Sequence, residues 1–190
     1  NIIAVATLGA ATAAFVLAPL IVPLLAPGLG DESGRQDELH ALAVELTRMM
    51  LLSPILFGIS GMLTGMLHAR QRFLAPALAP MIYNASIIVG AVALEPAFGV
   101  HGLAIGVIAG AAGHLAVQLP ALRGTGMRWH PTLDLRSDGV AEVARLMGPR
   151  VLGLAAGQIN LLVLIFFASF VADGAVSAIN YAFLMMMLPV

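Results

Sequence analysis

Few side chains in this sequence could do chemistry, because only 10% of its residues are charged. All nine basic residues are arginine, there are no cysteines, and the five histidines are scattered without the spacing of a metal site. The sequence lacks the HExxH and GxSxG signatures of hydrolases, a Walker loop and an EF-hand loop. Its acidic residues are spread over separate loops and helix ends. These patterns predict a protein that is not an enzyme and that holds neither a metal nor a cofactor.

Uncharged polar side chains lie deep inside apolar stretches, where polar groups are costly and therefore informative. Gln158 and Asn160 form one such group, and Asn180 belongs to another with Ser177 and Tyr181. We favour hydrogen bonding between helices for these residues, and contact with a substrate is the alternative.

Three glycines at every fourth position are continued at the same spacing by a histidine and a glutamine between residues 102 and 118. This ridge consists of Gly102, Gly106, Gly110, His114 and Gln118. Small residues let membrane helices approach closely, so we predict a close helix contact in which His114 and Gln118 bond to a neighbouring helix. The alternative is a polar wall of a cavity. A second patch, formed by Gly58, Gly61 and Gly65, predicts another contact of the same kind.

The composition indicates whether water or lipid surrounds the elements that position these residues. Of the 190 residues, 60% are hydrophobic and only 10% are charged, and the mean hydropathy is +0.98. Soluble domains carry about 25% charged residues, so a soluble fold could not cover its surface with so few. The sequence predicts an all-α integral membrane protein, because a β-barrel would show alternating segments of about ten residues. The net charge of -1 gives no indication of a nucleic-acid partner.

Six stretches are long and apolar enough, or nearly so, to cross the ~30 Å hydrocarbon core as helices. They cover approximately residues 2–26, 39–67, 78–94, 100–122, 149–171 and 174–190. Pro54 falls inside the second stretch, where it would kink the helix. Residues 140–147 predict a short amphipathic helix at the interface, before Pro149 starts the fifth span. Because the chain starts and stops inside apolar runs, we expect an internal piece of a longer polytopic protein.

The arginines also predict the orientation of these spans. Loops on one side of the membrane carry Arg70, Arg72, Arg123, Arg128, Arg136 and Arg145. The other side has Arg35, and Arg48 lies near the start of the second span. Basic residues in short loops mark the cytosol, so the first side is predicted to be cytosolic and the acidic loop 31–38 to face outward. We interpret Arg70 and Arg72 as topological anchors, with direct ligand contact as the alternative.

A succession of motifs runs along nearly the whole chain. It comprises Pro27-Gly28, Pro54–Gly61, Leu63–Phe73, Pro76–Pro80, Asn84, Gln118–Pro120, Met147–Pro149, Gln158-Ile159, Phe167–Ser169, Gly174 and Tyr181-Ala182. In order and spacing this succession resembles the MurJ/MviN family of lipid II flippases. The resemblance implies a fourteen-helix, two-lobed exporter fold, of which this chain would supply about the third to the eighth helix.

The same resemblance implies a function. The family moves a polyprenyl-pyrophosphate-linked peptidoglycan precursor from the cytosolic to the outer leaflet of the bacterial plasma (inner) membrane, by alternating access around a cationic cavity. The implied partners are this glycan substrate, membrane lipid and the remainder of the chain. The alternatives are a sibling exporter of another polyprenyl-linked glycan or of drug-like cations, and a non-transporting membrane scaffold.

The last predicted span departs from the family pattern. Members commonly read Y-A-D-R-L there, with the arginine in the cavity, whereas Leu184 takes the arginine's place here and cannot bind phosphate. Arg150 is then the basic residue nearest to a helix mouth, and guanidinium groups suit anionic headgroups. The candidate substrate-binding residues are therefore Arg150, Gln158, Asn160 and Asn180.

Overall fold

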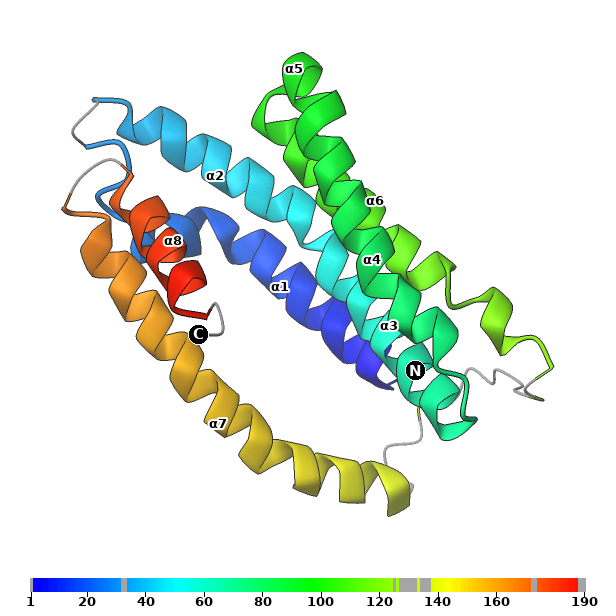
Figure 1. The fold of residues 1–190 in the computed structure, drawn as a ribbon. Helices are drawn as coiled ribbons and strands as arrows, with labels where there is room; N and C mark the ends of the chain where they lie inside the picture. Colours follow the sequence, from blue (N-terminus) through cyan, green and yellow to red (C-terminus); the bar gives the residue numbers. More distant parts are fainter. Residues whose placement is uncertain are drawn as a thin grey trace. The chain divides into compact units, whose positions relative to one another are not determined.

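The computed structural model of the chain describes residues 2–31, 34–124, 126, 133, 138–171 and 174–187. Its regular elements are helical, and no β-strand occurs in the described residues (Figure 1). In chain order they are α1 (Ile2–Leu25), α2 (Gln36–Met50), α3 (Leu52–Ala69), α4 (Leu74–Val89), the π-helix η1 (Gly90–Leu94), α5 (Glu95–Phe98), α6 (Val100–Ala116), the 3-10 helix η2 (Pro120–Leu122), α7 (Asp138–Ala168) and α8 (Ala175–Met187). The prediction of an all-α fold is confirmed.

Among the described residues, five helical stretches are long and apolar enough to cross a membrane. They are Ile2–Leu25, Gln36–Ala69, Leu74–Phe98, Val100–Leu122 and Gly139–Ala168, and they overlap the first five predicted spans. The sixth predicted span contains α8, a shorter apolar helix of 13 residues, and its residues 188–190 lie outside the described chain. Helix α4 begins earlier than the predicted residue 78, because a proline in the first turn removes no helical hydrogen bond.

The second span is interrupted near its proline. Helix α2 ends at Met50 and α3 begins at Leu52, so the interruption falls at Leu51. Pro54 has no N–H to donate to the carbonyl of Met50, four residues earlier. The helix is therefore interrupted before the proline, next to the carbonyl that has lost its hydrogen-bond donor.

The fifth span differs from its prediction at the start. Residues 140–147 form the first turns of α7 and not a separate helix, because the 31-residue α7 continues through Pro149 (Figure 1). A proline inside a helix can bend it without ending it, since residues on both sides keep their own hydrogen bonds. The interfacial position of residues 140–147 stays a prediction, and Arg128 and Arg136 of the preceding loop lie outside the described residues.

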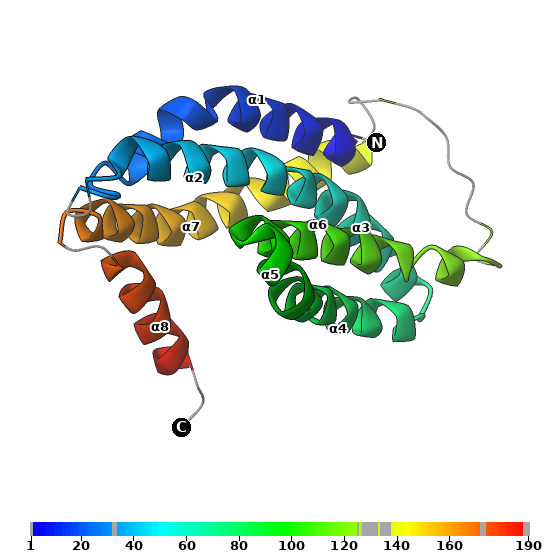
Figure 2. The ribbon, with the colours of Figure 1, turned by 90° about the horizontal axis from the view of Figure 1, so that it is seen from above.

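Two compact units divide the chain, and α1 and α2 contribute to both. Unit 1 comprises Asn1–Val16 and Leu46–Leu133, and unit 2 comprises Leu17–Glu45 and Asp134–Val190. In unit 1, α6 packs against α3 and against α4 with η1 (Figure 2). In unit 2, α7 and α8 contact each other.

The core of unit 1 is built on the glycines of α6. A Cβ atom at Gly106 would lie 2.9 Å from the Cα atom of Gly90 in η1, and one at Gly102 would lie 2.6 Å from the carbonyl carbon of Leu94. Both distances are too short for any side chain. The predicted close helix contact of the 102–118 ridge is therefore confirmed, and its partner is the end of the preceding span.

The second glycine patch makes a contact at one position. A Cβ atom at Gly58 in α3 would lie 3.0 Å from Cγ2 of Thr7 in α1. At Gly61 and Gly65 an added Cβ would meet no atom within 4 Å beyond its own helix in the described residues. The prediction of a close helix contact therefore holds at Gly58 alone.

Candidate functional site

The polar end of the α6 ridge is joined to α3 by a hydrogen-bonded cluster. Ser60 Oγ lies 2.6 Å from His114 Nδ1, and Gln118 Nε2 donates to Ser60 Oγ at 2.7 Å. Thr64 Oγ1 donates to Gln118 Oε1 at 2.9 Å. Ser60 and Gln118 are both 0% exposed. The predicted bonding of His114 and Gln118 to a neighbouring helix is confirmed, and we call these four residues the α3–α6 cluster.

Aromatic rings lie beside this cluster. The ring of Phe57 meets His114 edge-on with centroids 5.1 Å apart, and it meets Tyr83 of α4 in the same way at 5.0 Å. Buried polar groups that satisfy one another hold helices together in lipid. The cluster thus has the geometry of a helix contact.

Ser60 and Thr64 did not stand out in the sequence as the partners of this cluster. They lie on α3 four residues apart, which is also the spacing of His114 and Gln118 on α6. Residues four apart share a helix face, so two such pairs are able to meet across one helix contact. This equal spacing is the signal that would identify them.

The turn between α3 and α4 is fixed by Arg72. Its Nη1 donates to the carbonyl oxygens of Ala121 and Arg123, both at 2.7 Å. Ala121 belongs to η2 and Arg123 follows it, so both carbonyls lie at the C-terminal end of the fourth helical stretch, where helical donors are lacking. Arg72 therefore ties the turn between α3 and α4 to this helix end within unit 1, which is a structural role, while the cytosolic location of the turn stays a prediction.

Three of the four candidate residues lie on α7, in unit 2. Arg150, Gln158 and Asn160 are all exposed, and no side-chain hydrogen bond links them to another described residue. At about 100° per residue, Gln158 and Asn160 face nearly opposite directions. At about 1.5 Å per residue, Arg150 lies roughly 27 Å along the helix from Ala168, close to the thickness of the hydrocarbon core.

The fourth candidate, Asn180, lies on α8. It is exposed, and its Nδ2 donates to the Val176 carbonyl of its own helix at 2.9 Å. Leu184, where the resemblance implies an arginine in other members, is 62% exposed. Helix α8 follows the end of α7 that is farther along the chain from Arg150. The fold of unit 2 therefore does not bring the four candidates to one point.

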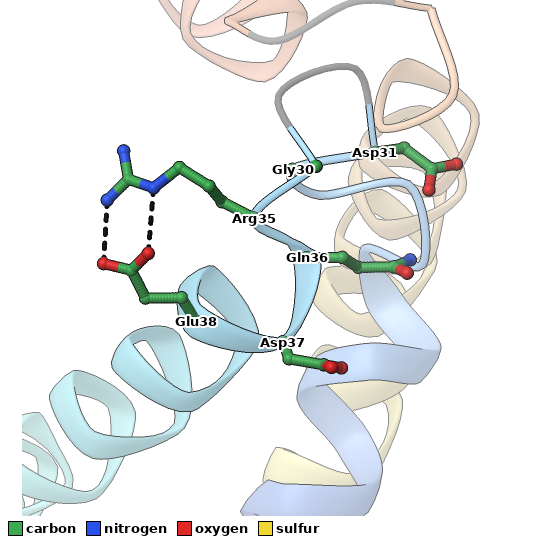
Figure 3. A pocket seen from close by; sticks show the side chains of 7 residues that line it. Gly30, Asp31, Arg35, Gln36, Asp37 and Glu38 are labelled. Carbon is green, nitrogen blue, oxygen red and sulfur yellow. Dashed lines mark hydrogen bonds and ion pairs between the residues drawn. The ribbon is translucent and has the colours of Figure 1, made fainter.

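An open pocket of about 450 Å³ lies over the loop before α2 (Figure 3). It is lined by Gly30, Asp31, Gly34, Arg35, Gln36, Asp37 and Glu38. Arg35 donates to both oxygens of Glu38, from Nε at 2.9 Å and from Nη2 at 2.8 Å, and this exposed pair points away from Gln36 and Asp37. Water and salt screen an exposed ion pair of this kind. The described residues hold no group of three or more His, Cys, Asp or Glu side chains that could bind a metal.

Two sequence motifs far apart in the chain meet in unit 2. The N–H of Gly28 donates to Ser169 Oγ at 3.3 Å, and that hydroxyl donates to the Phe166 carbonyl at 2.8 Å. A Cβ atom at Gly28 would lie 2.1 Å from the Ser169 carbonyl oxygen. The Pro27-Gly28 and Phe167–Ser169 motifs are therefore two halves of one packing contact.

A family model described as "Lipid II flippase MurJ" matches residues 1–190. The chain belongs to the MurJ family. It is 34% identical over 154 residues to the "Lipid II flippase MurJ" of Burkholderia cenocepacia. The matched region covers 78% of this chain and 30% of that protein. It is 32% identical over 164 residues to the "Probable lipid II flippase MurJ" of Buchnera aphidicola subsp. Acyrthosiphon pisum, covering 85% of this chain and 31% of the relative.

A third MurJ relative is the "Probable lipid II flippase MurJ" of Bdellovibrio bacteriovorus, 36% identical over 129 residues, with 66% of this chain and 24% of the relative covered. The resemblance to MurJ/MviN is thus confirmed, and the chain spans less than a third of the length of these relatives. Several of its MurJ-like motifs make helix contacts: Gly58 and Ser60 in the second span, Gln118 in the fourth, and Gly28 with Ser169.

Proposed function

We propose that this chain forms part of a flippase that moves lipid II from the cytosolic to the outer leaflet of the bacterial plasma membrane. The observation that carries the proposal is the MurJ match over residues 1–190, and helices long enough to span a bilayer support it. The movement is alternating access within a larger exporter fold, and it makes and breaks no covalent bond. The substrate is a polyprenyl-pyrophosphate-linked glycan, and the remaining helices come from the rest of the protein.

The exposed polar side chains of α7 support a substrate cavity beside this helix. Arg150, Gln158 and Asn160 interrupt an apolar helix without a partner in the described residues. Polar groups facing lipid are costly, so they need a polar neighbour, which a cavity or another helix supplies. A guanidinium group binds phosphate oxygens in a bidentate manner, which suits Arg150 to the pyrophosphate. Gln158 or Asn160, which lie on nearly opposite faces of α7, and Asn180 would contact the polar headgroup.

Growth of a strain depleted of its own flippase tests this function. The full-length protein is expected to restore growth, whereas Arg150→Ala should restore it less well at an equal membrane level. Arg145→Ala is the matched control, since it removes an exposed arginine from a different face of the same helix. Failure of the unsubstituted, correctly inserted protein to rescue growth would contradict lipid II transport.

Leu184 motivates the two alternative functions, because it removes the cavity charge that the family carries. Purified full-length protein in vesicles distinguishes them, when it is assayed with lipid II, another polyprenyl-linked glycan and a drug-like cation. Transport of lipid II supports the main proposal. Transport of one of the others alone favours a sibling exporter, and no transport favours a scaffold.

The direction of transport requires the 68–73 turn to face the cytosol. In a cysteine-free full-length protein, Gln71→Cys should react with a membrane-impermeant maleimide only after the inner face is opened. Asp37→Cys, in the acidic loop, should react in intact cells. Both positions are exposed in the structure, so access to the reagent depends on the side of the membrane. Reaction of Gln71→Cys in intact cells would reverse the predicted topology.

A further inference from the structure

Helix α1 contains a backbone carbonyl that the helix itself cannot satisfy. Pro19 lies inside α1 and has no N–H, so the carbonyl of Phe15, four residues earlier, lacks its helical donor. Phe15 lies near the middle of this 24-residue apolar helix. Lipid offers no replacement donor, so an unsatisfied backbone group there is destabilising.

Arg48 of α2 supplies the missing donor. Its Nε lies 3.1 Å from the Phe15 carbonyl oxygen, and its guanidinium carbon lies 4.9 Å from the centre of the Phe15 ring. One side chain thus donates a hydrogen bond to Phe15 and makes a cation–π contact with the same residue. All these atoms belong to unit 1.

We propose that Arg48 is a clamp at Pro19 of α1, holding α2 to α1 through the Phe15 carbonyl that Pro19 leaves without a helical donor. The clamp explains why an arginine lies within an apolar span, where a charge is expensive unless it has a specific partner. It lies just where both helices leave unit 1, because the boundary falls between Val16 and Leu17 in α1 and between Glu45 and Leu46 in α2. This structural role is independent of the proposed transport.

A double-mutant cycle in the full-length protein tests the clamp. Arg48→Met removes the donor and should lower the thermal midpoint in detergent by roughly 2–4 °C. Pro19→Ala restores an N–H for Phe15, and the exposed Pro19 side chain leaves no cavity. In the Pro19→Ala background, Arg48→Met should therefore lower the thermal midpoint much less than it does in the parent protein. An equal loss in both backgrounds would overturn the proposal.

Two further variants separate the contacts. Phe15→Leu keeps the carbonyl and removes only the ring, so it should lower the thermal midpoint less than Arg48→Met does. Arg48→Lys keeps a donor, so its thermal midpoint should lie between those of the parent protein and Arg48→Met. If Arg48→Met does not fold, recovery of folded protein in the Pro19→Ala, Arg48→Met double variant supports the clamp, and no recovery contradicts it.

Hydrogen exchange gives a local readout that transport does not influence. Arg48→Met should speed amide exchange in the part of α1 around residues 15–22, and Pro19→Ala should slow it again. Unchanged exchange there in Arg48→Met would overturn the proposal. Because neither stability nor exchange requires lipid II, failure of the proposed function leaves this test intact.

Discussion

The Gly106→Ala variant is expected to lose about 1–3 kcal/mol of stability, the usual cost of overpacking a core. The new methyl group would lie 2.9 Å from the Gly90 Cα atom and 3.0 Å from the Ser86 carbonyl oxygen. Both are backbone atoms, so α6 would have to move away from α4 and η1. The measurement is the thermal midpoint of the full-length protein in detergent, together with its folded yield from membranes.

Gly61→Ala is the matched control for this prediction. The same substitution is made in the middle of a helix, but the new methyl group meets no atom within 4 Å beyond its own helix in the described chain. Alanine forms helices better than glycine by up to about 1 kcal/mol, so this variant should be neutral or slightly more stable. Equal behaviour of the two variants would contradict the close contact between α6 and η1.

The Gln118→Leu variant is expected to lose about 1–3 kcal/mol, because it leaves buried partners without their hydrogen bonds. Thr64 loses its acceptor, and Ser60 loses the donor from Gln118, while Ser60 keeps its contact with His114. Hydrogen bonds between membrane helices average somewhat less than this range, so the lower half is the more realistic expectation. Thermal unfolding of the full-length protein measures the loss.

Two comparisons make the Gln118 prediction specific to the α3–α6 cluster. Adding Thr64→Val to Gln118→Leu removes the hydroxyl group that has lost its hydrogen-bond acceptor, and it should recover part of the stability. Gln158→Leu makes the same change at an exposed position of α7, where no described residue bonds to the side chain, and it should leave stability nearly unchanged. A cluster that holds no helices together would give the same result for Gln118→Leu and Gln158→Leu.

Packing motifs were easier to predict from the sequence than the substrate site. The ridge from Gly102 to Gln118 repeats every four residues, and a helix converts that period into one face. Only the folded chain showed that Gly90 and Leu94 are its partners, because the glycines of the ridge carry no information about which neighbour they accept. The identity of Ser60 and Thr64 as partners of Gln118 was open for the same reason.

The sequence was less informative about the candidate substrate-binding residues of α7. The sequence marked Gln158 and Asn160 as polar residues in an apolar span, but their separation by two residues places them on nearly opposite helix faces. The helical continuity through Pro149 was also missed, since proline ends one helix and bends another depending on the residues that flank it.

Hydropathy and repeat spacing in the sequence alone determined that this chain forms apolar helices for a membrane, because lipid admits only backbones that satisfy their own hydrogen bonds. The order of its motifs determined the family. The tertiary structure decided which faces meet, which glycines are indispensable, and that Arg48 of α2 lies against Phe15 of α1. Those choices depend on contacts between residues distant in the chain, whose complementarity appears only when the helices are packed together.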